Sequence, residues 1–221
     1  MPQLRSHPLS EAALMVLAPG ALAVLEIFHP HVHDPMALDL RLWLTIHYAQ
    51  MPLFVLAAMA MAWAVREHTG VAAALCRVAM FVFAVSYVAF DTAAGIVTGV
   101  LVQAAQVSGM PELWRAPIQA VWAHPILGGA PGMPAPPVLA VLGAVAWSLG
   151  AVCAAISLKR RGAGWGPCLL LAVSSFGIAV FQTHAWPGGP VTFGGLAVAA
   201  AWILWQPRQP VLAAVSAPGA G

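Results

Sequence analysis

The sequence predicts an all-α integral membrane protein, a polytopic helical bundle of six transmembrane helices with both termini in the cytoplasm. Its 221 residues are 61% hydrophobic and only 7% charged, whereas a soluble domain carries about 25% charged residues. The mean hydropathy is +0.86. A helix needs about 20 apolar residues to cross a bilayer, and charged or Pro/Gly-rich segments separate six such stretches. We therefore expect one integral-membrane domain over residues 1–221, located in the cell membrane as a multi-pass protein.

Each predicted helix is an apolar stretch bounded by charged residues, prolines or glycines. The expected ranges are 11–28, 42–65, 75–103, 137–158, 165–185 and 190–206. Glu11 and Glu26 flank the first helix without a small-residue cleavage pattern, so we expect this helix to remain in the mature chain.

The positions of the basic residues predict the orientation. Seven of the nine fall on the side of the N-terminus, namely Arg5, Arg66, Arg77, Lys159, Arg160, Arg161 and Arg208. Only Arg41 and Arg115 fall on the other side. Because basic residues are retained in the cytoplasm, both termini are expected there. Most histidines then lie at the external face.

One long external connection, residues 104–134, is expected at the membrane interface. Trp114, Ile118 and Trp122 recur in it at helical spacing, which predicts a short amphipathic helix on the membrane surface or over the mouth of the bundle. His124 follows this helix, and we favour a structural role for it over a role as a ligand.

The external segment 25–39, LEIFHPHVHDPMALD, holds the densest group of candidate metal ligands, His29, His31, His33 and Asp34. Two prolines keep it out of a helix, and alternate residues of an extended chain point the same way. Three imidazoles could therefore face one side, with the carboxylate as an oxygen ligand or as the partner that orients a ring. We expect a divalent metal, zinc ahead of copper or iron. The alternative is a solvated polar loop.

Two histidines on the helices could complete this site. His47 lies six residues beyond Arg41, about 9 Å along its helix, beside the kink expected at Pro52. His184 precedes a tight turn at the end of the fifth helix and is expected to face the same space. Glu26 precedes His29 by three residues, the E-x-x-H spacing of carboxylate-bridged metal sites in bundles.

Asp91 is the strongest candidate for a catalytic residue. It lies about 18 Å along its helix from Gln103, which places it near mid-membrane, where an ionised carboxylate is costly unless it is paired, hydrated or protonated. Gly95 and Gly99 follow at GxxxG spacing. Small residues at this spacing let another helix approach closely, and the same face could instead support a homo-oligomer.

No established motif assigns a function. The repeated histidine boxes of desaturases and the HExxH of zinc proteases are absent, and the single lysine, Lys159, is not in the last helix as a rhodopsin requires. The net charge of +2 does not suggest nucleic-acid binding.

Three functions therefore remain open. The first is a metal-dependent membrane enzyme, open to the external face, acting on a lipid or small amphiphile, with Asp91 or Glu26 as general base or ligand. The second is a transporter of protons or metal ions that uses the external histidines and Asp91. The third is a b-type haem or quinone electron-transfer protein with His47 and His184 as axial ligands.

Overall fold

The computed structural model describes residues 9–131 and 133–205, and all regular secondary structure in this part of the chain is helical. The helices are α1 (Leu9–Ile27), the 3-10 helix η1 (Pro35–Ala37), α2 (Leu40–Ala64), α3 (Val71–Asp91), the π-helix η2 (Thr92–Val97), α4 (Thr98–Ser108), α5 (Pro111–Trp122), α6 (Val138–Arg160), α7 (Trp165–Ser174), α8 (Gly177–Phe181) and α9 (Gly188–Trp205). The all-α prediction is confirmed for these residues.

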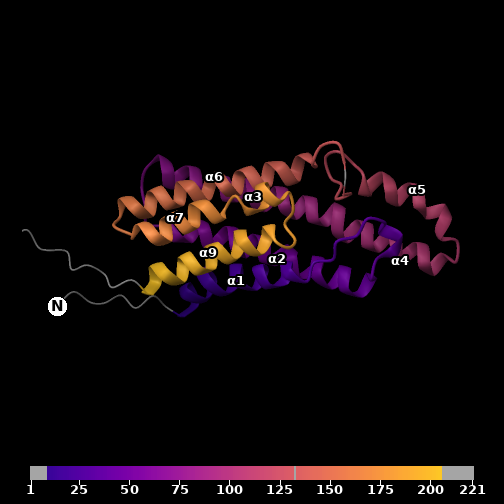
Figure 1. Cartoon of the computed structure of the whole chain (residues 1–221), viewed down its shortest axis with the longest axis horizontal. Helices are drawn as coiled ribbons and strands as arrows, with labels where there is room; N and C mark the ends of the chain where they lie inside the picture. Colours follow the sequence, from indigo (N-terminus) through magenta and orange to yellow (C-terminus); the bar gives the residue numbers. More distant parts are fainter. Residues whose placement is uncertain (1–8, 132, 206–221) are drawn as a thin grey trace, which may run out of the picture.

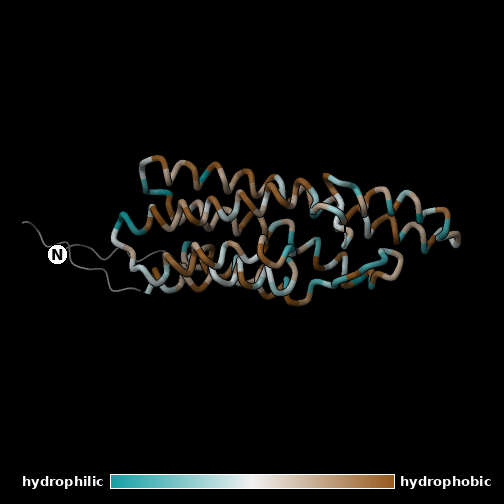
Figure 2. Tube along the Cα trace, turned by 45° about the horizontal axis from the view of Figure 1, so that its top comes forward, coloured by the Kyte–Doolittle hydropathy of each residue, from teal (hydrophilic) through white to brown (hydrophobic). Residues whose placement is uncertain are grey.

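Six helical segments form a closed ring around a common apolar core. Along the ring, α1 packs on α2, α2 on α3, α3 on α6, α6 on α7, α7 on α9, and α9 returns to α1. Figure 1 shows these helices side by side along the long axis of the molecule. Figure 2 shows apolar residues along the helices and hydrophilic ones concentrated near the ends. The apolar stretches that predicted the helices therefore form the long apolar helices that a membrane-spanning bundle requires.

Five helices of the described chain are long and apolar enough to cross a membrane. They cover Ser10–Ile27, Leu40–Ala64, Val71–Ser108, Val138–Arg160 and Gly188–Trp205. This agrees with a membrane protein, and the starts and ends of these helices lie within five residues of the predicted ones. A sixth span is not confirmed, because the predicted fifth helix is shorter and is broken.

The break lies between α7 and α8, at Ser175 and Phe176. Neighbouring helices satisfy the backbone groups that the break releases: the Ser148 hydroxyl donates to the Ser175 carbonyl at 3.0 Å, and the Ile178 amide donates to the Thr192 hydroxyl at 3.0 Å. Interrupted helices are tolerated in membranes under this condition. Residues 182–185 turn instead of extending the helix, which corrects the predicted range 165–185.

The helix formed by α3, η2 and α4 is longer than predicted. It runs without interruption over 38 residues, Val71–Ser108, about 57 Å at 1.5 Å per residue, whereas the hydrocarbon core of a bilayer is about 30 Å thick. In Figure 1, α4 and α5 reach beyond the ends of the other helices. The residues after Asp91 therefore form an extension of the bundle and are not simply the outer half of a span.

This extension changes the expected depth of Asp91. Helices α3 and α6 pack antiparallel, with Gly150 against Met80 and Gly143 against the Tyr87 ring. Asp91 lies one turn beyond Tyr87, so it is level with the first turn of α6. The expectation of a mid-membrane Asp91 assumed a helix end near Gln103, whereas the helix continues to Ser108. The depth of Asp91 in a membrane stays a prediction.

The basic residues expected in the cytoplasm gather at one end of the bundle. The Arg66 guanidinium donates to Glu11 at 2.8 Å and so ties the end of α2 to the start of α1, and Arg161 donates to the Glu67 carbonyl at 3.4 Å. Two of the predicted basic positions, Arg5 and Arg208, lie outside the described residues. The start of α1 and the end of α9 share this end (Figure 1), while the side of the membrane stays a prediction.

We expect single-cysteine labelling to assign that side. Leu113 on α5 is 69% exposed, and Gly162 lies in the exposed turn at the opposite end. In a variant with the three buried native cysteines replaced by Ala, Leu113→Cys should react with an impermeant maleimide in intact cells. Gly162→Cys should react only after permeabilisation, and the reverse pattern would invert the orientation.

Candidate functional site

A pocket of about 680 Å³ occupies the end of the bundle next to α4 and α5. We call it the central pocket. Its walls come from the α1–α2 connection, from α2 and α3, from the segment after α5, and from α6, α8 and the turn after α8. Three polar residues that the sequence singled out from separate segments line it, His47 on α2, Asp91 on α3 and His184 in the turn after α8.

Three imidazole rings meet in this pocket. His29 follows the last turn of α1, His47 lies in the second turn of α2, and His184 lies in the turn between α8 and α9. The ring centroid of His29 is 5.0 Å from that of His47 and 4.8 Å from that of His184. We call these three residues the inner histidines. The fold thus brings residues from three separate segments into direct contact.

Two of the inner histidines are oriented by backbone carbonyls. The Nδ1 atom of His29 donates to the Pro30 carbonyl at 3.1 Å, and Nδ1 of His47 donates to the Trp43 carbonyl at 2.7 Å. Because a carbonyl can only accept, a neutral ring then keeps a lone pair on Nε2. The Nε2 atoms of His29 and His184 have no hydrogen-bond partner among the described residues.

Burial keeps the two histidines outside the helices neutral. It lowers the pKa of His29 well below its usual value, and the neighbouring His184 and His47 lower that pKa further. Burial also lowers the pKa of His184 to about 3. Both rings are therefore neutral at neutral pH, and His29, whose Nδ1 donates to the Pro30 carbonyl, has its lone pair on Nε2.

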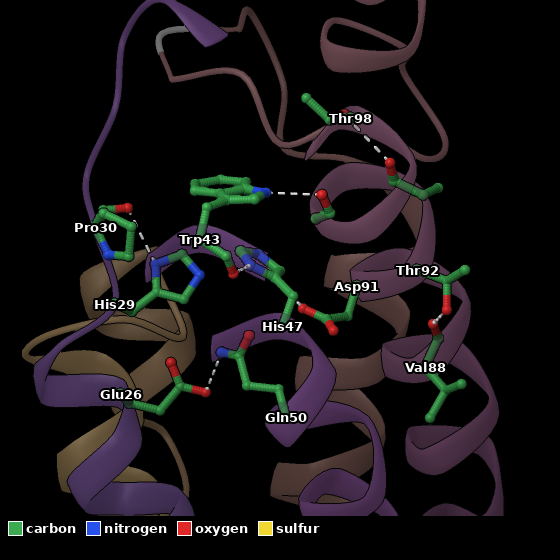
Figure 3. Close-up of polar contacts among 12 residues, drawn as sticks. Glu26, His29, Pro30, Trp43, His47, Gln50, Val88, Asp91, Thr92 and Thr98 are labelled. Carbon is green, nitrogen blue, oxygen red and sulfur yellow. Dashed lines mark hydrogen bonds and ion pairs between the residues drawn. The ribbon is translucent and has the colours of Figure 1, made fainter. Parts of the chain in front are cut away.

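Two buried carboxyl groups accompany the rings. Asp91 is 1% exposed, and its Oδ1 lies 3.8 Å from Nε2 of His47. Neither of its oxygens has a hydrogen bond within the described chain. Glu26 is fully buried and accepts a hydrogen bond from the Gln50 amide at 2.9 Å, which leaves its Oε2 without a partner. Figure 3 shows Glu26 and Gln50 beside His29 and His47, with Asp91 beyond His47.

Unpaired buried polar atoms are rare in folded proteins, and each one requires an explanation. Among the described residues, those that line the central pocket belong to His29, Asp91, Trp122 and His184. The two imidazoles and the carboxyl group can accept protons or bind metals, whereas the Trp122 indole can only donate. A purely structural polar network would satisfy its members internally. The arrangement therefore indicates a binding or catalytic site.

The π-helix η2 shapes one wall of this site. Its Gly95 carbonyl accepts a hydrogen bond from the Trp43 indole at 2.7 Å, and a methyl group at Gly95 would collide with the His47 ring. A methyl group at Gly99 would approach Leu44 within 2.6 Å. The GxxxG face thus packs on α2 of the same chain, as the first of the two readings of this spacing predicts, and a homo-oligomer stays a prediction. Single π-helical turns occur frequently at functional sites.

We expect Gly95→Ala to displace His47. The added methyl group overlaps the imidazole, so the ring must turn or the helices must separate, at a cost of about 1–3 kcal/mol. Thermal unfolding in detergent should show a lower midpoint. Gly20→Ala is the matched control, because its methyl group would meet only Ala197 at an ordinary 3.8 Å, and equal midpoints for the two variants would contradict the prediction.

The other predicted ligands lie away from the inner histidines. His31 and His33 line the central pocket but are exposed at its rim, so the three loop histidines do not share one environment. Asp34 accepts the Met36 amide at 3.0 Å and lies 3.5 Å from Arg115. It therefore caps η1 and holds the loop to α5.

Within the described ranges, no group of three His, Cys, Asp or Glu side chains is arranged to hold a metal ion. The metal site predicted from the loop is therefore not confirmed. The reason is geometric, because His29 turns inward toward α2 while the next two histidines remain at the rim.

The predicted external helix is present as α5, and Ile118 and Trp122 form its buried face. They join an apolar cluster with Trp43, Leu38 and residues of α4. Trp122 lines the central pocket, so this helix covers the mouth of the bundle. His124 accepts the Ile126 amide at 3.2 Å through Nδ1 and does not line the pocket, which agrees with a structural role.

Two contributing residues escaped the sequence analysis. Gln50 is fully buried beside Glu26, and Trp43 orients both His47 and Gly95. A signal for Gln50 was present, because it is a polar residue three positions after His47 and so on the same face of a membrane helix. No local signal marked Trp43, whose indole partner lies 52 residues away.

Comparison of the chain with known protein families, with curated proteins and with solved structures gives no match. The function is therefore argued from the site.

Proposed function

We propose that the protein is a metal-dependent enzyme of the cell membrane whose site opens to the external face and acts on a lipid or small amphiphile. One observation carries this proposal: three imidazole rings and the buried Asp91 carboxyl group line one pocket, and a second buried carboxyl group, Glu26, lies beside His29 (Figure 3). The membrane-spanning helices and the pocket at one end of the bundle are consistent with it.

The spacing of the inner histidines supports a metal. Zinc–nitrogen bonds of about 2.0–2.1 Å in tetrahedral geometry place neighbouring imidazole centroids about 5 Å apart, and the two measured separations are 5.0 and 4.8 Å. Metal-binding histidines also donate their second nitrogen to a carbonyl or carboxylate, as His29 and His47 do here. In our proposal the rings turn on binding so that their Nε2 atoms meet at one zinc ion, with copper or iron as the alternatives.

The carboxyl groups supply the proton chemistry in this proposal. A zinc ion held by the three inner histidines would supply a Lewis acid and lower the pKa of a bound water. Asp91, 3.8 Å from Nε2 of His47, would be the general base beside it. Glu26, held by Gln50, is the second acceptor or an additional ligand.

A layer of aromatic rings favours an enzyme over a transporter. Phe54 contacts His184, and behind it Phe83, Trp147 and Phe193 form a continuous set of ring contacts. All four are buried in the core. A transported ion would have to cross this layer, so a pocket open at one end fits catalysis better.

The haem alternative fits the ring contacts less well. Axial ligation by two histidines requires a flat porphyrin between their rings. The His29 ring lies within 5.0 Å of the rings of both proposed axial ligands, His47 and His184, which leaves little space for a porphyrin.

Two measurements on untagged protein, purified without chelators, test the proposal. Elemental analysis should find about one zinc, copper or iron per chain, and the visible spectrum should show no Soret band. Incubation with membrane lipid extract, followed by mass spectrometry, should then reveal a lipid consumed by the metal-loaded protein only. Protein that binds none of these metals when they are added would refute the proposal, and a Soret band would favour haem.

A further inference from the structure

We propose that the central pocket takes up an acyl chain of a membrane lipid through a lateral opening between α6 and α8. The inference that the lipid reacts at its head group rests on the proposed function. The inference that its acyl chain enters the pocket is argued from the shape of the pocket alone.

Residues of the pocket wall reach the outer flank of the bundle. Val141 and Val145 of α6 and Ala179 and Phe181 of α8 all line the pocket. Val145 is nevertheless 59% exposed and Phe181 is 47% exposed. A side chain that borders both a pocket and the exterior marks an opening, so the pocket opens on the flank as well as at the end of the bundle.

The break before α8 accounts for this opening. Gly177, the first residue of α8, approaches the start of α9 so closely that a methyl group there would lie 2.6 Å from the Thr192 hydroxyl and 2.8 Å from the Gly188 carbonyl. The Ile178 amide is bonded to the same hydroxyl. Helix α8 is thus held against α9, and after five residues it turns away at Gln182, whose φ is 54°. Its packing against α6 is sparser than its packing against α9.

The opening lies at the depth of lipid chains. Val141 and Val145 are three and seven residues from Val138, the start of α6, about 5 and 11 Å along the helix. This is the outer half of a hydrocarbon layer about 30 Å thick. Lipid chains surround the flank of a membrane bundle at this depth, so a chain of the bilayer is the occupant that the position favours.

The polarity of the pocket orients that lipid. Its flank is bordered by valine, alanine, isoleucine and phenylalanine, and its inner end holds the inner histidines and Asp91. An amphiphile matches this gradient when its polar head lies at the histidines and its chain extends outward between α6 and α8. The substrate class is therefore a membrane lipid whose reacting group lies close to the head end of an acyl chain.

Photo-crosslinking in nanodiscs tests this inference. The probes are two phosphatidylcholines, one with a diazirine near the ester and one with a diazirine at the methyl end of the same chain. Ala144 and Ile178 are buried residues of the pocket wall. The ester-proximal probe should label them, whereas Ala151, equally buried on α6 but outside the pocket, should stay unlabelled. The methyl-end probe should label mainly exposed residues.

A bulky residue in the opening provides the second arm. Val145→Trp should lower labelling of Ala144 and Ile178 at least fivefold, whereas Leu149→Trp should not. Leu149 is the matched control, because it lies one turn along the same exposed face of α6 without lining the pocket.

Each outcome supports or overturns the inference. Adducts on exposed residues only, or equal labelling in the two tryptophan variants, would show that lipid merely surrounds the bundle. Metal content is measured on the same samples. If the protein binds metal but shows no adducts on buried residues, only the lateral opening is refuted. If it shows adducts on buried residues but binds no metal, only the proposed enzyme function is refuted.

Discussion

Replacement of His47 with Ala is expected to abolish high-affinity metal binding. His47 is 2% exposed and its ring contacts that of His29, so in the proposed site it supplies one of three ligands. Loss of an outer partner of a ligand alone costs about 10–100-fold in affinity, and loss of a ligand should cost more than about 100-fold. His184→Ala should behave in the same way. Elemental analysis and competition with a zinc-binding dye provide the measurement.

His33→Ala is the control for this experiment, because the same side chain is removed from the exposed rim. It should retain its metal with unchanged affinity. Circular dichroism and gel filtration establish that each variant is folded. Loss of metal from the His33 variant together with retention in the His47 variant would move the site to the loop and contradict the proposed site.

Asp91→Asn is expected to abolish turnover while the fold is preserved. The amide has nearly the shape of the carboxyl group but cannot accept a proton as a base. Removal of a general base typically lowers a rate by about 10²–10⁴-fold. Since neither oxygen of Asp91 has a hydrogen bond within the described residues, the exchange removes no hydrogen bond, and the thermal midpoint should not fall. Mass spectrometry of lipid extracts incubated with each protein provides the measurement.

Asp34→Asn is the matched control, because it makes the same chemical change at a half-exposed residue that caps η1. Asparagine also serves as a cap, so this variant should keep full activity. If the Asp91 variant keeps full activity, Asp91 is a structural residue, and the proposed mechanism loses its general base.

The class of the protein and most of its helices were predictable from the sequence. Burying backbone polar groups in lipid requires long apolar helices, and hydropathy is a local property that can be summed along the chain. The ranges of α1, α2, α6 and α9 follow from it closely. The amphipathic spacing of Trp114, Ile118 and Trp122 likewise predicted α5.

Helix ends and breaks were less predictable. The sequence of α3 stays apolar beyond the membrane thickness, because α4 packs there against α5 and η1 and not against lipid. No proline lies at the break between Ser175 and Phe176, and the glycine that follows, Gly177, does not by itself end a helix. The break depends on hydrogen bonds with Ser148 and Thr192 on other helices.

The sequence by itself determined which residues are candidates for a functional site, because a histidine or carboxylate among apolar residues is conspicuous at any depth. Only the tertiary structure decided which of them meet. His29 joins His47 and His184, whereas its neighbours His31 and His33 remain at the rim. The physical reason is that distance along the chain does not determine distance in a bundle. The register between helices is set by close packing, as at Gly95 against His47 and Gly177 against Thr192, and that register brings side chains from separate helices into one pocket.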